Sequence, residues 1–402
     1  MPVIAPRYAF ERVIAPMPVA QFLADYYGQR PLLLQRDQPK YYGDLVGVES
    51  LDEFLSVGPP QGGRVFAVDA RREIPSEEYT LPGERIDVVR LYQLFADGAT
   101  IGFPHMHEHV PALARLCRGA EQFFNCPFQT NLYFTPPNGQ GFKTHHDTHD
   151  VFVLQVAGAK RWRLYDPVIR LPLPGQDFDP ARHQPGPVVE ELTLRAGDLL
   201  YCPRGVPHDA SATAELSLHI TFGALAYSWA EVMIEAMADA CLDDEAFRRS
   251  LPVGFAADAA APDSLEAIFR DLVERFSRSA RFGQAIEGLR EKFISGRAAL
   301  LPDQRRQVTA LDAVALDSWV GGRPGLIYRC RVEGDEVKLH CHSTEIRFPR
   351  RAAAALTYAL EAPRFRVRDM SGGLDDAGKL TLVRRLIREG LVAMLPSGGD
   401  RE

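Results

Sequence analysis

The chain has 402 residues, of which 46% are hydrophobic and 25% are charged, and its net charge is −7 at pH 7. This composition is that of an ordinary soluble globular protein, and the length allows two or three domains. The acidic balance argues against wholesale nucleic-acid binding. The charge is uneven, since residues 301–402 hold 17 Lys and Arg against 14 Asp and Glu, which leaves 29 against 39 in the remainder.

Neither membrane insertion nor secretion is expected. The sequence has no apolar run of about 18 residues, the length that a membrane span needs. Residues 1–10 lack the basic and apolar regions of a signal peptide. The six cysteines are scattered without a Cys-x-x-Cys pair, which favours reduced thiols and a cytoplasmic location.

Short helices and strands alternate through the first part of the chain. Residues 17–36 predict a helix and then a strand over Leu32 to Leu34. A second helix is predicted over residues 49–56, with Ser50 as its N-cap. A strand over 64–69 and a helix that becomes extended over 86–101 follow.

Three histidines at spacing two, His105, His107 and His109, suggest a metal site. An apolar helix pattern begins at Val110, which places the histidines in the lead-in and first turn of that helix. Side chains two apart do not share a helix face. We therefore interpret them as a helix start, with a second metal site as the alternative.

Residues 126–226 change to a pattern of strands and turns. Strands are predicted over 128–134, 151–156, 160–165, 188–194, 198–202 and 216–222. Ala157-Gly158 is predicted to be a tight turn that makes 151–156 and 160–165 a hairpin, and a proline-rich loop spans 167–187. So many short antiparallel strands indicate a sandwich or a jelly-roll barrel.

Metal-capable side chains cluster where one of these strands begins. His145 and Asp147 are two residues apart, so in an extended chain both face one way while His146 faces the other. With the distant His208 they would supply two imidazoles and one carboxylate, the ligand set of non-haem Fe(II) oxygenases. A solvated histidine patch, or a pair formed by Asp147 and His149, are the alternatives.

Helices dominate after Tyr227. They are predicted over 228–242, 264–277 and 281–299, and their apolar faces must pack on the barrel or on another copy of the chain. From residue 301, strands are predicted near 325–331, 336–341, 345–349 and 364–366, helices over 350–360 and 375–389, and a final short strand after 390. Small helices with a β-wing predict a winged-helix-like unit. The expected domains are thus a barrel over 1–226, a helical region over 227–300 and a C-terminal unit over 301–402.

Several motifs together resemble the JmjC-type ribosomal oxygenases of the cupin superfamily. They are Asn131-Leu-Tyr-Phe134, His145-His-Asp147, Asp150-Val-Phe-Val-Leu-Gln-Val-Ala-Gly-Ala-Lys160-Arg-Trp-Arg-Leu-Tyr165, Pro203-Arg-Gly-Val-Pro-His208 and Ser217-Leu-His-Ile-Thr221. The resemblance covers nearly the whole chain, strongly over 120–225 and weakly after 300. It implies a double-stranded β-helix of the cupin and JmjC type, a helical dimerisation region and a winged-helix-like C-terminal domain.

The resemblance also implies an Fe(II)- and 2-oxoglutarate-dependent dioxygenase that uses O2 to hydroxylate a protein side chain. His145, Asp147 and His208 would be the iron ligands, and Lys160 would hold the distal carboxylate of 2-oxoglutarate. Asn131 and Thr221 match polar positions that line the same pocket. Some bacterial members carry arginine in place of Lys160, so the target, an arginine or a histidine of a large-subunit ribosomal protein, stays open. The implied partners are that protein substrate and a second copy of the chain.

The supporting residues also have purely structural interpretations. Lys160 could lie on a solvated hairpin edge, Asn131 could satisfy a strand end, and Thr221 is a common strand residue. His219 is expected to be a hydrogen-bonded core histidine and Trp162 to be core or a platform under the site. His340-Cys341-His342 is interpreted as strand sequence, because no fourth zinc ligand stands at the right spacing.

Other functions are compatible with the same barrel. A small-molecule oxygenase or a lysyl demethylase would use the same ligands, because fold alone does not decide the substrate. A ligand-sensing regulator that reads DNA through its winged helix is a further alternative, but the nearly neutral C-terminal region disfavours it.

Overall fold

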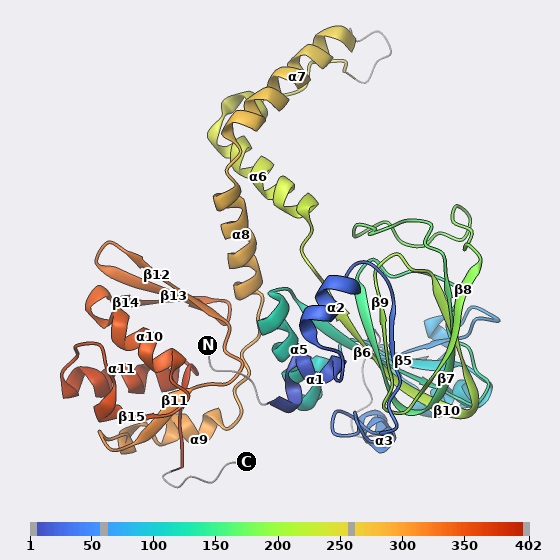
Figure 1. The fold of residues 1–402 in the computed structure, drawn as a ribbon, viewed down its shortest axis with the longest axis horizontal. Helices are drawn as coiled ribbons and strands as arrows, with labels where there is room; N and C mark the ends of the chain where they lie inside the picture. Colours follow the sequence, from blue (N-terminus) through green and yellow to red (C-terminus); the bar gives the residue numbers. More distant parts are fainter. Residues whose placement is uncertain (1–5, 57–62, 256–261, 397–402) are drawn as a thin grey trace.

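The computed structural model describes residues 6–56, 63–255 and 262–396 (Figure 1). An eight-stranded antiparallel sheet rolls up to form the barrel, with strand order β1-β9-β7-β10-β6-β5-β2 and β8 paired with β7. The strands of this sheet are β1 (Leu32–Leu34), β2 (Phe66–Val68), β5 (Thr100–Phe103), β6 (Phe128–Thr135), β7 (Asp150–Tyr165), β8 (Val188–Arg195), β9 (Leu199–Cys202) and β10 (His208–Ala224). The predicted antiparallel barrel is confirmed.

The two longest strands, β7 and β10, bend together. β10 pairs with both halves of β7, Phe222 opposite Phe152 and Ala210 opposite Trp162. The predicted hairpin with a turn at Ala157-Gly158 is therefore wrong, because the two segments pair with β10 rather than with each other. Gly158 has φ +62°, and a Cβ there would lie 1.7 Å from Leu216 O, so the close approach at the bend requires glycine.

The N-terminal part of the chain adds helices around the barrel, and those at Phe10–Ile14, Val19–Asp25 and Pro111–Phe124 lie together on one side of it (Figure 1). The helices are α1 (Phe10–Ile14), α2 (Val19–Asp25), α3 (Val48–Ser56), α4 (Val88–Ala96) and α5 (Pro111–Phe124), with a small hairpin of β3 (Thr80–Leu81) and β4 (Arg85–Ile86). Rings of Phe10 and Phe22 lie 5.5 and 5.7 Å from that of Phe152, which ties the helices to the sheet. The predicted Ser50 cap is wrong, because α3 begins at Val48 and Ser50 lies inside its first turn.

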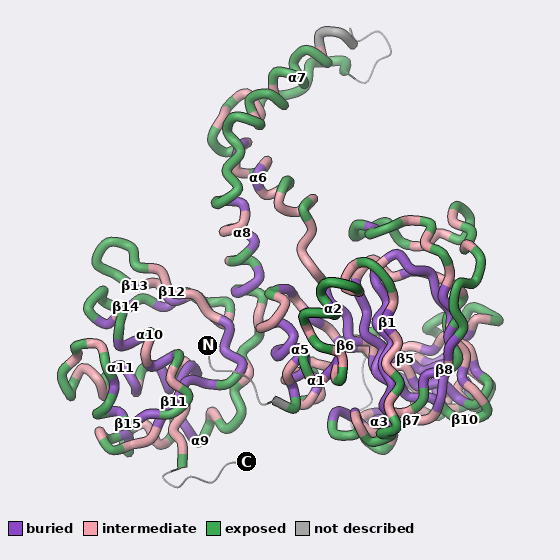
Figure 2. Tube along the Cα trace, viewed as in Figure 1, coloured by how far each residue is buried: buried purple, intermediate pink, exposed green. Residues whose placement is uncertain are grey.

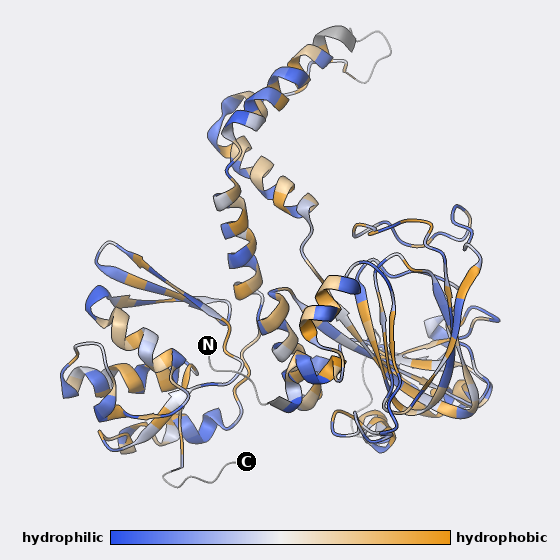
Figure 3. Ribbon diagram, in the orientation of Figure 1, coloured by the Kyte–Doolittle hydropathy of each residue, from blue (hydrophilic) through white to orange (hydrophobic). Residues whose placement is uncertain are grey.

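Three helices extend away from the barrel and from the C-terminal unit (Figure 1). They are α6 (Trp229–Asp243), α7 (Pro262–Ser279) and α8 (Phe282–Ser295), which confirms the predicted helices. Ser228 and Glu231 form a capping box at the start of α6. Much of α7 is exposed (Figure 2), although hydrophobic residues run along all three helices (Figure 3). The alternative in which these faces pack on the chain's own barrel is therefore wrong.

The C-terminal unit has its own hydrophobic core. Its elements are α9 (Gln304–Thr309), β11 (Trp319–Gly322), β12 (Tyr328–Glu333), β13 (Glu336–Cys341), β14 (Thr344–Pro349), α10 (Ala353–Glu361), β15 (Phe365–Arg366), α11 (Asp376–Arg388) and β16 (Val392–Met394). They form two three-stranded sheets, β15-β11-β16 and β12-β13-β14. The prediction missed α9 and β11, but His340 and Cys341 lie in a strand as predicted.

The six cysteines are free thiols, as the sequence predicted. Among the described residues, no helix is both long and apolar enough to cross a membrane.

Candidate active site

The structure brings His145, Asp147 and His208 together, with one ligand atom of each within 4.8 Å of the others. The two imidazole centroids are 4.7 Å apart, and His208 Nε2 lies 3.7 Å from Asp147 Oδ2. His145 and His208 face each other as a backbone pair, each N–H donating to the other's carbonyl at 3.1 and 2.7 Å. Residues 145–149 precede β7 rather than lie in it, but the expected alternation holds. His146 points away and its Nε2 lies 3.0 Å from Gln176 O.

Backbone carbonyls fix the tautomers of the two histidines. His145 Nδ1 lies 2.9 Å from Lys143 O, and His208 Nδ1 lies 3.0 Å from Val206 O. A carbonyl only accepts, so each Nδ1 carries the proton and each Nε2 keeps a free lone pair. This is the usual second contact of a metal-bound histidine. The donor set of two imidazoles and a carboxylate therefore fits Fe(II).

The electrostatics also favour deprotonated ligands. The pKa of His208 falls to about 4, first because the ring is buried and second because His145 lies beside it, while Asp147 opposes both effects. Burial raises the pKa of the Asp147 carboxyl, but the nearby imidazoles of His208 and His145 outweigh burial and hold that pKa below its usual value. At neutral pH His208 is therefore a neutral imidazole and Asp147 an ionised carboxylate, the forms that bind a metal.

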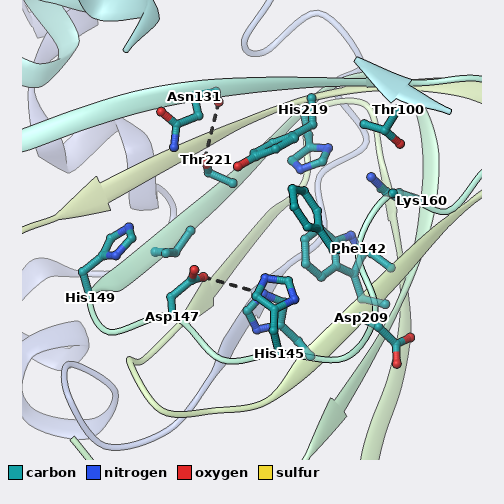
Figure 4. A pocket seen from close by; sticks show the side chains of 16 residues that line it. Thr100, Asn131, Phe142, His145, Asp147, His149, Lys160, Asp209, His219 and Thr221 are labelled. Atoms are coloured by element: carbon teal, nitrogen blue, oxygen red, sulfur yellow. Dashed lines mark hydrogen bonds and ion pairs between the residues drawn. The ribbon is translucent and has the colours of Figure 1, made fainter. Parts of the chain in front are cut away.

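A cavity of about 250 Å³ opens beside this cluster (Figure 4). All six residues predicted for the site line it, namely Asn131, His145, Asp147, Lys160, His208 and Thr221. Lys160 and His149 lie at opposite ends of the cavity, with Asp147 between them (Figure 4).

Lys160 points inward from β7. It is only 4% exposed, whereas its neighbours Arg161 and Arg163 are exposed, so the interpretation as a solvated edge is wrong. Its Nζ donates to Thr135 Oγ1 at 3.1 Å, and in the described part of the chain no carboxylate pairs with it. Burial lowers the pKa of Lys160 to about 7. A buried amine with only a hydroxyl partner can accommodate an anion from outside the chain.

Asn131 and Thr221 are cross-strand partners on β6 and β10. Thr221 Oγ1 donates to Asn131 O at 3.4 Å (Figure 4), and Asn131 Oδ1 accepts from His105 N at 3.0 Å. Both residues line the cavity and also make hydrogen bonds that join neighbouring segments. A role in the pocket and a structural role are therefore compatible for this pair.

Sequence reasoning missed Tyr133, Phe142 and Thr100, which also line the cavity. Tyr133 lies two residues after Asn131 on β6, so strand alternation could have found it. Its ring stacks on His219 at 5.2 Å. His219 is buried as predicted, but its Nδ1 has no hydrogen-bond partner among the described residues, so the prediction of a hydrogen-bonded core histidine is wrong. Trp162 is buried at 5.7 Å from the His208 ring, which confirms its place under the site.

The second histidine group lies outside this cavity, beside Asn131. His105, His107 and Glu108 approach within 4.8 Å of one another, and Glu108 takes the place expected for His109. His107 Nδ1 accepts the Thr130 N–H at 3.2 Å, so a neutral His107 carries its proton on Nε2 and has no lone pair left for a metal. The group forms a 3₁₀ turn over Met106–Glu108 ahead of α5, in agreement with the helix-start interpretation.

Known proteins share this domain and this fold. Residues 105–232 match the JmjC domain family. The bifunctional lysine-specific demethylase and histidyl-hydroxylase NO66 of Aedes aegypti is 29% identical over 308 residues, which are 72% of this chain and 48% of the relative. Ribosomal oxygenase 2 of Mus musculus is 31% identical over 260 residues, 62% of this chain and 55% of the relative. The chain thus spans about half the length of the curated relatives it matches.

Solved structures of Escherichia coli YcfD cover almost the whole chain. One aligns with a TM-score of 0.53 at 20% identity, over 94% of this chain and 98% of its own. Another, of YcfD described as a ribosomal oxygenase in complex with cobalt and 2-oxoglutarate, aligns with a TM-score of 0.52 at 17% identity, over 95% and 99%. The barrel is therefore a cupin-type JmjC fold. The JmjC domain match and the similarity to a protein named ribosomal oxygenase confirm the resemblance seen in the motifs of this chain.

Proposed function

We propose that this protein is an Fe(II)- and 2-oxoglutarate-dependent dioxygenase that hydroxylates a protein side chain. One observation carries the proposal: a two-histidine, one-carboxylate cluster and an unpaired buried lysine share a single cavity. The names of the relatives, histidyl-hydroxylase and ribosomal oxygenase, support it. So does the YcfD structure that holds cobalt and 2-oxoglutarate.

His145, Asp147 and His208, which all line the cavity, would hold Fe(II). When bound with 2-oxoglutarate and O2, the iron supplies the oxidising chemistry that places an oxygen atom on a substrate C–H bond. The chain's own residues supply the positioning. Carbonyls of Lys143 and Val206 orient the two imidazoles, and the buried rings of Trp162 and His219 keep water from that side.

Lys160 would bind the distal carboxylate of 2-oxoglutarate. Its ammonium group lines the cavity and donates to the Thr135 hydroxyl. Among the described residues it has no ionic partner. A carboxylate placed there would compensate the buried positive charge of the ammonium group through a charge-assisted hydrogen bond. Fixing one end of the cosubstrate in this way leaves its keto-acid end directed toward the metal ligands.

The opposite end of the cavity would receive the substrate side chain, and its chemistry favours histidine over arginine. Asn131, His149 and Thr221 there offer an amide, an imidazole and a hydroxyl group (Figure 4). A free carboxylate is the best-matched partner of a guanidinium, but Asp147 and Asp209, the carboxylates among the described lining residues, are both committed. Asp147 faces the metal position, and Asp209 accepts hydrogen bonds from Thr144, Arg163 and Tyr165. We therefore propose a histidine of a large-subunit ribosomal protein as the target.

The remaining parts of the chain would serve assembly. We propose a homodimer formed through α6, α7 and α8, whose exposed residues include Trp229 at 73% and Phe269 at 64%. The C-terminal unit would be a winged-helix-like module for protein contacts, and the enzyme would act in the cytoplasm. A lysyl demethylase stays the second candidate, because the NO66 relatives carry both activities in their name.

Mass spectrometry of ribosomal proteins tests the proposal. We expect a gain of one oxygen on a histidine in cells that hold the gene, its loss in the deletion strain, and its return with the wild-type chain but not with His208→Ala. The same oxygen on an arginine would retain the enzyme class and correct the target. If no ribosomal residue is hydroxylated and methyl-lysine is lost from another protein, the result would favour the demethylase.

A further inference from the structure

The Asp209 carboxylate is the centre of a hydrogen-bond network beside the metal-ligand cluster. It is only 5% exposed. Its Oδ2 accepts from the hydroxyl groups of Thr144 at 2.7 Å and Tyr165 at 2.6 Å, and its Oδ1 accepts from Arg163 Nε at 2.9 Å. Both oxygens are therefore satisfied within the chain, and the reaction proposed above assigns Asp209 no role.

This network joins the two segments that carry the histidine ligands. Thr144 immediately precedes His145, and Asp209 immediately follows His208. The Thr144–Asp209 hydrogen bond thus lies one residue beyond the paired backbone bonds of His145 and His208. The backbone pair fixes the distance between the segments, and a side-chain bond next to it restricts their twist. The distance between the two Nε2 atoms depends on that twist.

The other two partners tie the same carboxylate to β7. Arg163 is the cross-strand partner of Asp209, and the N–H of Tyr165 donates to Pro207 O at 2.9 Å. The Arg163 side chain is 44% exposed, so its ion pair by itself contributes little stability. The two hydroxyl groups meet on one oxygen and are the stronger geometric constraint, because they fix the carboxylate from the segment that carries His145 and from the end of β7.

We propose that Asp209 is a positioning residue that holds His145 and His208 at metal-binding separation. This inference rests on the proposed function, since it requires that the cluster binds a metal. It adds that the chain builds the ligand geometry before the metal arrives, through a carboxylate whose two oxygens already accept hydrogen bonds from Thr144, Arg163 and Tyr165. Outer contacts of this kind commonly change metal affinity by about ten- to a hundredfold.

Titration of the metal-free protein with Co(II) tests the proposal, with the dissociation constant from calorimetry and the visible ligand-field spectrum as readouts. Asp209→Ala should weaken Co(II) binding by about ten- to a hundredfold and change the spectrum. The matched control is Asp198→Ala. Asp198 is another buried carboxylate of the barrel that accepts two backbone N–H groups, from Arg36 and Arg195, outside the cavity. The Asp198→Ala variant should have a lower melting temperature and an unchanged affinity for Co(II).

A gentler change covers the case in which Asp209→Ala does not fold. Thr144→Val with Tyr165→Phe removes the two hydroxyl donors and should cost about fivefold in Co(II) affinity for each bond. Asp209→Asn should regain part of the affinity, because an amide can still bond to both hydroxyl groups. Wild-type affinity in the folded alanine variant or in the double variant would overturn this inference alone. A wild-type chain that binds no Co(II) would overturn the metal site and the inference together.

Discussion

Lys160 Nζ donates to Thr135 Oγ1 at 3.1 Å, and Thr135 Oγ1 lies in turn 3.0 Å from Thr100 Oγ1. The amine is thus held at the closed side of the cavity by neutral hydroxyl groups, all of them buried. Neutral partners orient an ammonium group without neutralising it. The arrangement leaves the ammonium group free to pair with an anion in the cavity. A dicarboxylate cosubstrate supplies such an anion in its distal carboxylate.

The first prediction follows from this contact. Lys160→Ala should raise the KM for 2-oxoglutarate about ten- to a hundredfold, since a hydrogen bond to a charged group contributes about 1.5–3 kcal/mol. Metal content should stay at the wild-type level, and Lys160→Arg should be partly tolerated. Arg161→Ala is the matched control, because that side chain is a neighbour on the outer face. An unchanged KM in Lys160→Ala would mean that another cation holds the cosubstrate.

The second prediction concerns pH. Burial lowers the pKa of Lys160 to about 7 in the free protein, and a bound carboxylate would raise it. Below pH 7 the amine is already charged, so affinity for 2-oxoglutarate should be flat. Above pH 7, binding must take up a proton, and affinity should fall by about tenfold for each pH unit until the pKa of the complex is reached.

Calorimetry at pH 8 in buffers of different ionisation enthalpy checks this. Uptake of nearly one proton on 2-oxoglutarate binding is expected for the wild type. Lys160→Arg should bind without that uptake, because arginine stays protonated. Equal proton uptake in the two proteins would assign the titration to a different group.

The sequence predicted the cluster because its chemistry is local. His145 and Asp147 lie two residues apart, and extended backbone of any kind puts them on one side. The third proposed ligand, His208, was predicted from the motif Pro203-Arg-Gly-Val-Pro-His208. By contrast, Lys160 and its partner Thr135, and Asp209 and its partner Thr144, are pairs of residues that lie far apart in the sequence. They depend on the register of β6, β7 and β10, which no local pattern contains.

The errors in the fold have similar causes. Ala157-Gly158 has the composition of a hairpin turn, and only the pairing of both halves of β7 with β10 shows that it is a bend. The missed strand β11 is short and ends in Gly321 and Gly322, and the missed α9 is a short polar helix without an apolar face. Elements of this kind form because the core of the C-terminal unit holds them, so their own residues indicate little.

The third prediction separates the two possible ligand pairs. His208→Ala should abolish binding of Fe(II), or of Mn(II) in its place, and with it the turnover of 2-oxoglutarate, because two ligands are too few to hold the ion against water. His149→Ala should keep one metal per chain, since His149 lines the cavity outside the cluster. Metal analysis after dialysis measures both. Metal retained in His208→Ala but lost in His149→Ala would show that Asp147 and His149 form the ligand pair.

The last prediction concerns assembly. Trp229, Ile234, Ile268 and Phe269 are each more than half exposed on helices that extend away from the rest of the chain. Apolar faces of this size usually contact a partner, and a two-fold dimer is the commonest outcome. Light scattering at micromolar concentration should therefore give a mass near twice 44.7 kDa.

Phe269→Glu should reduce that mass to the monomer value and keep activity per chain, because the cavity lies in the barrel. The control is Arg278→Glu. It introduces the same side chain nine residues further along α7, on the opposite face at roughly 100° per residue, and should leave the dimer intact. A wild-type chain that stays at 44.7 kDa would rule out the dimer, and dissociation by both variants would show that charge on α7, rather than its apolar face, controls assembly.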